Sequence, residues 1–544
     1  MGRGTDQRPN AVQTDGGRRC KARHGPGIAT DSALATITLA NVTGCPLNAH
    51  AACTSGTQRS QTLRDEAMPI RFKNSYKPVL SAVALLVLAG CASLSPDGNL
   101  ADIQQLTQGK TGGTSVVLTR DPQAIQTTVA DLLTAPVTAE SAVRIALLNN
   151  PGLQGSMATL GISDADRVQA GRLPNPHFSI GRFVEGDVRE IERILRFDVI
   201  GLLTLPWKAK WQGQQHELAK LQAAQEVVKL ASNTRKAWTM AVAAQQTALY
   251  MRDVKEAAEA GAELARRMAR VGNWSKYQQA REQVFLADAT AQLARAEQAN
   301  FSEREKLIRL MGLWGAQTSF TLSERLPDLP KSVTEMGDVE SRALRERLDL
   351  RSAMAESGYV ADQLGFKQVT GYLDGMTLEV TRSTIFDNAK GTREARNGLA
   401  LEFPLPIFDW GGARNARAQA TYMQSAARVR DMAVKARSEA REAYHGYRTA
   451  YDLARHYRDE MVPLRKFIND ELVLRYNGML ASVWDLLADT RSQVRSINSA
   501  IEAQRDFWLA EADLQTTLTG MSAGGLSSMK ARAGGMGGEA AAAH

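Results

Sequence analysis

The sequence predicts a mainly α-helical protein with a small β part, built from a duplicated unit of helix, two strands and long helical hairpin. Residues 208–270 contain no proline and only two glycines, and they are rich in the helix formers Ala, Gln, Glu, Lys and Leu. Four short stretches alternate apolar and polar residues, as strands do. Segments about 200 residues apart also echo one another in the same order.

The N-terminal region of the 544-residue chain is predicted to contain a late signal peptide. From Met68 the sequence reads MPIRFKNSYKPVLSAVALLVLAGC, a basic stretch followed by the apolar run 79–88. A run of about ten residues is too short for a membrane-spanning helix, which needs about 20, but it suits a signal peptide at residues 68–90. Residues 1–67 lack helical or strand periodicity, so we expect them to be a misassigned extension.

The charge distribution argues against a nucleic-acid partner. The formal net charge is +8, but residues 1–90 hold eleven Lys and Arg against five Asp and Glu, which is +6. Residues 91–544 therefore carry only +2. This near-neutral balance does not indicate a basic stripe that would bind nucleic-acid phosphates.

The last cysteine follows the apolar run directly. The four cysteines are Cys20, Cys45, Cys53 and Cys91, so the main body has neither a disulfide framework nor a CxxC metal site. LAGC, residues 88–91, resembles the lipobox of bacterial lipoproteins, which implies that Cys91 carries lipid. Ala92 behind it, in place of Asp, implies transfer to the outer membrane. An ordinary signal peptide or a chance apolar run is the alternative interpretation.

The mature chain divides by pattern. Residues 91–137, rich in Gly, Thr, Ser and Gln, indicate an extended, lipidated leader. A first helix begins near Thr138 and ends before Pro151. Residues 138–330 and 331–520 are the two predicted repeats, and the Gly/Ala-rich tail 521–544 is expected to be disordered. Three methionines and a terminal histidine leave soft-metal binding open for that tail.

Each repeat is expected to hold two strands and a helical hairpin. Strands are predicted around 178–180, 195–199, 376–380 and 399–405, with turns at 186–187 and 387–388. Helices are predicted over 208–270 and 413–475, each followed by a return helix, to about 310 and 518. Pro463 should kink the second long helix. A solvated coiled coil is the plainer interpretation of such helices.

The order of three paired segments supports the duplication. ALLNNPGL at 146–153 matches ALRERLDL at 343–350, LTLPWKAKW at 203–211 matches FPLPIFDWGG at 403–412, and RVGNWSKYQQAREQV at 270–284 matches RYNGMLASVWDLLADTRSQV at 475–494. A period this long indicates a duplicated domain-sized unit and not a solenoid.

Four alternating strands in one chain predict an oligomer if they lie in a membrane. An open sheet edge leaves backbone groups unpaired in lipid, and single-chain barrels begin at about 8 strands. Three chains would supply twelve strands, enough for a barrel with an open lumen. Arg196, Asp198, Glu379 and Glu402 would face that lumen. A small soluble four-stranded sheet is the alternative.

Four motifs carry a family resemblance: LAGC, NNPGL, LPIFDWGGARNARA and RYNGMLASVWDLL. Together they resemble the TolC-like outer-membrane efflux protein family in its lipoprotein branch, over Thr138 to about Met521. The resemblance implies a homotrimer with a twelve-stranded β-barrel in the cell outer membrane and an α-helical barrel across the periplasm. It implies a passive exit duct of a tripartite efflux system, fed by a periplasmic adaptor and an inner-membrane pump.

The resemblance also assigns residues. Pro406, Gly411 and Gly412 match the family's strand-to-helix junction, although the first repeat lacks the glycine pair. Asp485 matches an acidic ring at the pore entrance, where three copies would attract cations. The family's second aspartate position is Ala488 here, with Asp489 just beyond. Arg475 and Tyr476 are the remaining gate candidates. A helix N-terminal charge is the alternative for Asp485.

No catalytic motif is found. The seven histidines are scattered without HExxH spacing, and no P-loop, GxSxG or dinucleotide-binding glycine motif occurs. The sequence predicts a non-enzyme without cofactor or metal site. A periplasmic adaptor lipoprotein of an efflux or type I secretion system is the alternative function, and a lipid-anchored scaffold coiled coil is another. Both explain the duplicated hairpin and the four strands less well.

Overall fold

A computed structural model describes residues 93–114, 118, 119, 121–370, 376–403, 405 and 407–522, with the side chains of 367–370 excepted. All of these lie in Ser75–His544, the second of two units into which the chain divides. The predicted extension 1–67, the signal peptide, Cys91, Pro406 and residues 523–544 of the tail lie outside the described residues.

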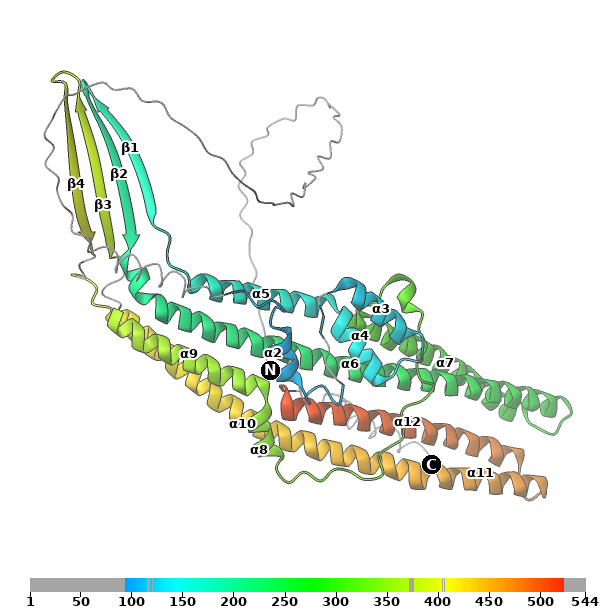
Figure 1. Cartoon of the computed structure of the whole chain (residues 1–544). Helices are drawn as coiled ribbons and strands as arrows, with labels where there is room; N and C mark the ends of the chain where they lie inside the picture. Colours follow the sequence, from blue (N-terminus) through cyan, green and yellow to red (C-terminus); the bar gives the residue numbers. More distant parts are fainter. Residues whose placement is uncertain are drawn as a thin grey trace, which may run out of the picture. The chain divides into compact units, whose positions relative to one another are not determined.

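Helices dominate the described chain, and four strands form one sheet (Figure 1). The helices are α2 (Leu100–Thr107), α3 (Pro122–Leu133), α4 (Ala139–Asn149), α5 (Pro151–Ala170), α6 (Val199–Arg270), α7 (Lys276–Met311), α8 (Val339–Glu346), α9 (Leu348–Thr370), α10 (Gly412–His456), α11 (Val462–Asn477) and α12 (Val483–Thr519), with a short 3-10 helix at Gly315–Thr318. Two helices, two strands and a long hairpin thus occur twice in succession.

The sheet has the order β1-β2-β3-β4 and is antiparallel throughout. Its strands are β1 (His177–Glu185), β2 (Val188–Asp198), β3 (Thr377–Asp387) and β4 (Thr392–Glu402). The two central strands come from different repeats and pair along their whole length, from Val188 opposite Asp387 to Asp198 opposite Thr377. All four predicted strands are present, although β2 and β4 end before the apolar residues Val199 and Leu405 that extended the predicted alternation.

The first long helix starts nine residues earlier than expected. It runs without a break from the end of β2, because the Asp198 side chain accepts a hydrogen bond from the Gly201 N–H at 2.7 Å and caps it. Pro206, which precedes the predicted helix start at 208, lies inside the helix. Its 72 residues span about 110 Å at about 1.5 Å per residue. This direct start explains why the first repeat has no glycine pair.

The sequence predicted a kink at Pro463, and the structure has a π-helical turn just before this residue. Tyr457–Met461 form this turn between α10 and α11, and Pro463 is the second residue of α11. Proline lacks the N–H that an α-helix interior requires and clashes with the preceding turn, and a wider turn just before it removes both conflicts.

The leader is not wholly extended, because it contains α2 and α3. It is fastened to both repeats: Lys110 Nζ donates to the Glu346 carbonyl at 2.7 Å, and Trp238 Nε1 donates to the Val137 carbonyl at 2.8 Å. Helix α5 was also not predicted. Its glycines and serines weaken its propensity, but Leu153 and Leu160 are buried in a cluster with residues of α6. Tertiary packing therefore stabilises it.

Small side chains form much of the interface between long helices. The buried residues of α6 include many alanines, among them Ala224, Ala241 and Ala265, and Ala440 and Ala450 occupy the same role on α10. Such residues let helix axes approach closely. Within the residues that the structure describes, no helix combines the length and the apolar character needed to cross a membrane.

Candidate functional site: the tips of the two helical hairpins

The end of the helical region remote from the sheet consists of two hairpin tips (Figure 1). The first tip, residues 271–275, joins α6 to α7, and the second, residues 478–482, joins α11 to α12. Both return helices begin with a capping box, formed by Ser275 with Gln278 and by Ser482 with Asp485. Met479 in the second tip has φ 59°, a left-handed conformation unusual for a residue with a side chain.

Asp485 is exposed and forms part of the helix cap. Its carboxylate accepts hydrogen bonds from the Ser482 hydroxyl at 2.7 Å and from the Ser482 N–H at 3.0 Å. The bond from the hydroxyl, and then the bond from the N–H, lower the pKa of Asp485. The residue therefore stays negatively charged to a lower pH than an ordinary aspartate. Both the capping role and a role at a pore entrance are compatible with this position.

The other three predicted gate residues lie at the same tip without joining Asp485. Asp489 is nearly buried, with 10% of its side chain exposed, and its Oδ1 lies 3.9 Å from an Arg465 nitrogen on α11. Arg475 and Tyr476 are exposed near the end of α11. In the described part of the chain, the side chains of Arg475 and Tyr476 form no hydrogen bond or ion pair. Their roles at the entrance stay a prediction.

A contact cluster that the sequence analysis missed links the two hairpins. The inter-hairpin cluster consists of Trp274, Arg281, Glu282, Phe285, Trp484, Leu487 and Arg491. Arg491 Nη2 of α12 lies 2.5 Å from the Glu282 carboxylate of α7, which is 1% exposed. The Arg491 guanidinium also lies 4.6 Å from the ring centre of Phe285.

Aromatic contacts complete this cluster. The rings of Trp274 and Trp484, one from each hairpin, meet edge to face at 6.2 Å, and the Arg281 guanidinium lies 4.2 Å from the Trp484 ring centre. Cation–π contacts of this kind contribute about 0.5–1 kcal/mol at exposed sites and more when desolvated. The cluster therefore joins the tips by one ion pair and several ring contacts.

Gly261 allows the close approach behind this cluster. A Cβ added to Gly261 of α6 would lie 3.3 Å from Leu487 Cδ2 of α12, which is tighter than ordinary contact. One signal for this region was present in the sequence, a tryptophan in the first tip and another at the start of α12. Glu282 gave none, because a glutamate in a polar helix usually indicates a solvated face.

The strand-to-helix junction of the second repeat requires one of its two glycines. Gly411 has φ 74° and its N–H donates to the Asp409 carboxylate at 2.8 Å, so it forms the sharp entry to α10. Gly412 has no positive φ, and a Cβ there would meet nothing within 4 Å.

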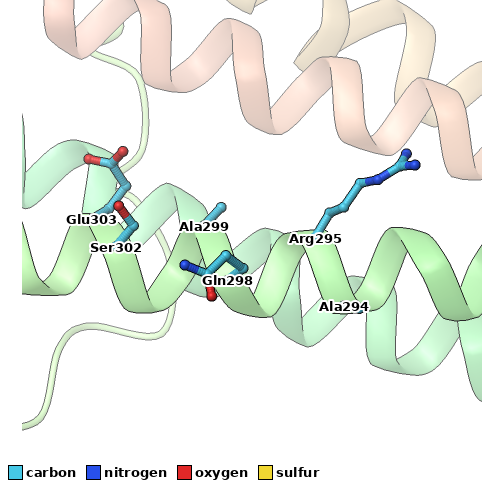
Figure 2. A pocket seen from close by; sticks show the side chains of 6 residues that line it. All are labelled: Ala294, Arg295, Gln298, Ala299, Ser302 and Glu303. Carbon is cyan, nitrogen blue, oxygen red and sulfur yellow. The ribbon is translucent and has the colours of Figure 1, made fainter.

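A shallow groove of about 560 Å³ follows one face of α7, where Ala294, Arg295, Gln298, Ala299, Ser302 and Glu303 line it (Figure 2). Three of these side chains, Ala294, Ala299 and Ser302, are small. No group of three or more His, Cys, Asp or Glu side chains in the described residues could hold a metal ion.

Solved structures share this fold. VceC, an outer membrane protein of Vibrio cholerae, is 16% identical with a TM-score of 0.57, and the match covers 70% of this chain and 96% of VceC. The CmeC outer membrane channel of Campylobacter jejuni is 15% identical with a TM-score of 0.56, over 73% of this chain and 88% of CmeC. The open MtrE outer membrane channel of Neisseria gonorrhoeae is 16% identical with a TM-score of 0.56, over 70% and 89%.

The likeness is one of structure. No family model matches the sequence, and no curated protein matches it. The solved channels nevertheless match over most of their own length, and the match includes proteins whose described function is to form a channel. The chain therefore has the fold of the TolC-like outer-membrane efflux channels, which confirms the family resemblance at the level of the fold.

Proposed function

We propose that the protein is an outer-membrane channel-tunnel lipoprotein, the passive exit duct of a tripartite efflux system. The observation that carries this proposal is the shared fold, in which one small sheet and two long hairpins recur as in solved outer membrane channels. Energy for transport would come from an inner-membrane pump reached through a periplasmic adaptor, since nothing in the sequence suggests catalysis.

The open sheet supports a trimer. In the order β1-β2-β3-β4, the outer edges of β1 and β4 have no partner strand among the described residues. Exposed strand edges in a membrane must be paired, and three copies joined edge to edge would close a twelve-stranded barrel. The hairpins of the same three copies would then surround a helical tunnel, with the tips at its periplasmic entrance.

The adaptor alternative fits the fold less well. An adaptor needs one hairpin, whereas this chain has two that contact each other through the inter-hairpin cluster. In our proposal the adaptor is a separate protein, and the α7 groove is a surface on which its helices could dock.

Labelling from outside the cell tests this topology. Asp187 lies in the exposed turn between β1 and β2, and Asn273 lies exposed in the first hairpin tip. We expect Asp187→Cys to react with a membrane-impermeant maleimide on intact cells. Asn273→Cys should react only after the outer membrane is permeabilised, and the unsubstituted protein gives the background. If both cysteines need permeabilisation, the protein is periplasmic and the adaptor proposal replaces ours.

The lipid anchor is a separate part of the proposal. The LAGC motif supports lipidation of Cys91, which would tether each subunit beside the barrel. Radiolabelled palmitate should be incorporated by the unsubstituted protein and not by Cys91→Ala. If Cys91→Ala still incorporates label, the anchor is assigned wrongly, whereas the channel proposal is unaffected.

A further inference from the structure

The two faces of the sheet carry opposite charge. Strand register places alternate residues of all four strands on one face. The acidic face holds every carboxylate of the strands, namely Glu185, Glu190, Glu192, Asp198, Glu379, Asp387, Glu394 and Glu402. The opposite face, called the arginine face below, holds Arg182, Arg189, Arg193, Arg382 and Arg393 and no carboxylate.

The arginine face is also divided along the strands. The two rows nearest the long helices consist only of apolar residues, which are Phe178, Leu195, Phe197, Leu378, Val380, Leu399 and Leu401. All five arginines lie in the three rows nearest the turns. The innermost arginine row, which also holds Ile180 and Asn397, follows directly after an apolar row.

The arginines lack counter-charges in the sheet. Arg193 and Arg382 are Cα partners directly opposite each other, an arrangement of like charges that destabilises a strand pair. The described residues offer no ion pair or hydrogen bond to the side chain of any of the five. On the acidic face, by contrast, Arg196 forms a 2.8 Å ion pair with Glu379.

One aromatic ring lies between two of these arginines. The guanidinium carbons of Arg189 and Arg393 lie 4.9 and 5.3 Å from the ring centre of Phe386. Arg189 Nε is buried and has no hydrogen-bond partner. The shared ring keeps the two guanidinium groups close to each other on this face. A single anion could therefore bind both of them.

The apolar rows show which face of the sheet points out of the barrel, and this step rests on the proposed function. In a barrel they must face lipid, so the arginine face is the outer surface. Exposed apolar residues continue the apolar band beyond the strands toward the helices, among them Leu202, Leu203, Trp207, Phe403 and Leu405. The hydrocarbon layer therefore surrounds the end of the sheet that is nearest the long helices. The arginine rows lie outside this layer, at the end of the sheet that holds the turns and is remote from the periplasmic helices.

We propose that the arginine face binds phosphate groups of the outer-leaflet lipid, a phosphorylated glycolipid whose phosphates lie at the hydrocarbon boundary. Guanidinium groups bind phosphate oxygens through paired, charge-assisted hydrogen bonds. The innermost pair, Arg193 and Arg382, meets the apolar rows, so it lies at the depth of such phosphates. In a trimer the site occurs three times around the barrel.

The test uses the purified full-length trimer and lipopolysaccharide with both lipid A phosphates, with bound lipid counted by native mass spectrometry. The double variant Arg193→Gln/Arg382→Gln removes the innermost pair. The matched control, Arg196→Gln/Arg396→Gln, removes the two strand arginines of the acidic face. Arg393→Gln against Arg396→Gln gives a second comparison, on the exposed edge strand β4, if the first double variant does not assemble.

We expect the arginine-face variant to lose about tenfold in affinity, as removal of two charged hydrogen-bond donors predicts. The control should stay near the unsubstituted protein, and lipid A stripped of its phosphates should bind all of them weakly. Equal binding by both variants, or full binding of phosphate-free lipid A, overturns the proposal. Conductance of the same unsubstituted preparation reports on the channel separately, so a conducting trimer with no difference between variants refutes only the lipid site.

Discussion

Arg491 of the second hairpin and Glu282 of the first form an ion pair 2.5 Å long, with the glutamate almost fully buried. The contact lies close behind the two hairpin tips, where Trp274 and Trp484 also meet. Separation of the two hairpins at this level must break this pair. The pair therefore acts as a clasp between the hairpins, and the first two predictions below depend on it.

Removing the clasp should open the entrance. Arg491→Ala leaves the Glu282 carboxylate buried without its partner, and loss of one partner of a buried pair costs about 3–5 kcal/mol. We expect the tips to separate and the single-channel conductance to rise several-fold. The control is Arg252→Ala, which removes an exposed 3.0 Å ion pair with Glu297 inside the first hairpin. Equal conductance of the two variants would show that the clasp does not hold the entrance.

Overfilling the contact behind the clasp should have a similar, smaller effect. In Gly261→Ala the new methyl group meets Leu487 Cδ2 at 3.3 Å, so the two hairpins must move apart slightly. Conductance should rise modestly, and a second substitution, Leu487→Ala, should return it toward the original value because it clears the space. A rise that persists in the double variant would assign the effect to helix α6 alone.

Charge at the second tip should set ion preference. Three copies of Asp485 around an entrance attract cations, and hydrogen bonds from Ser482 lower the pKa of its carboxyl. Asp485→Asn should reduce the cation-to-anion permeability ratio, measured as a reversal potential in a salt gradient. Because of the lowered pKa, the preference of the unsubstituted channel should persist to a lower pH than an ordinary aspartate would allow. Asp288→Asn, an exposed carboxylate on α7, is the control, and an equal change in both variants would exclude a ring at the tip.

The buried His216 should make the helical region less stable in acid. Burial lowers its pKa, although the Asp164 carboxylate, 3.9 Å away, favours the charged form. A histidine held neutral stabilises the fold above its unfolded pKa of about 6.5, and this contribution falls as pH drops below that value. Its ring is also 3.3 Å from Asn99 Oδ1 at the start of α2, so attachment of the leader is involved.

The measurement for His216 is the unfolding temperature at pH 7.5 and 5.5. The unsubstituted protein should lose stability between the two, by at most about 1.4 kcal/mol per pH unit below 6.5 from this one residue. His216→Gln keeps a polar side chain without a titration in this range and should show a flatter dependence. Parallel curves for the two proteins would assign the acid sensitivity to other groups.

The two junction glycines should respond in opposite directions. Gly411 has φ 74°, where a Cβ costs about 1–2 kcal/mol, so Gly411→Ala should lower the unfolding temperature. Gly412 is the first residue of α10 and has open space around it, so Gly412→Ala should be neutral or stabilising. Similar losses in both variants would mean that the junction is constrained by something other than backbone conformation.

The sequence was most informative where a feature is periodic. Alternation predicted all four strands. A run without proline predicted the first long helix, and helix formers interrupted only by Pro463 predicted the second, within two residues at each predicted end except the start of α6. Capping chemistry predicted the start of α4 at Thr138, whose side chain forms the capping box with Ser141. These features are local, so neighbouring residues in the sequence contain the information.

Features that depend on distant contacts could not be predicted. Helix α5 is stabilised by burial of Leu153 and Leu160 in a cluster shared with α6, and no local pattern shows this. The clasp joins Glu282 and Arg491, which are 209 residues apart, and each looks like an ordinary surface charge. The charge separation of the sheet also depends on register, because β2 and β3 come from different repeats.

The measurement that tests the central claim most directly is the current across a planar lipid bilayer after addition of the purified full-length trimer. A channel-tunnel predicts discrete single-channel steps, with larger steps for Arg491→Ala, in which the clasp is removed. A bilayer that stays silent with both the unsubstituted trimer and Arg491→Ala at every voltage would contradict the account.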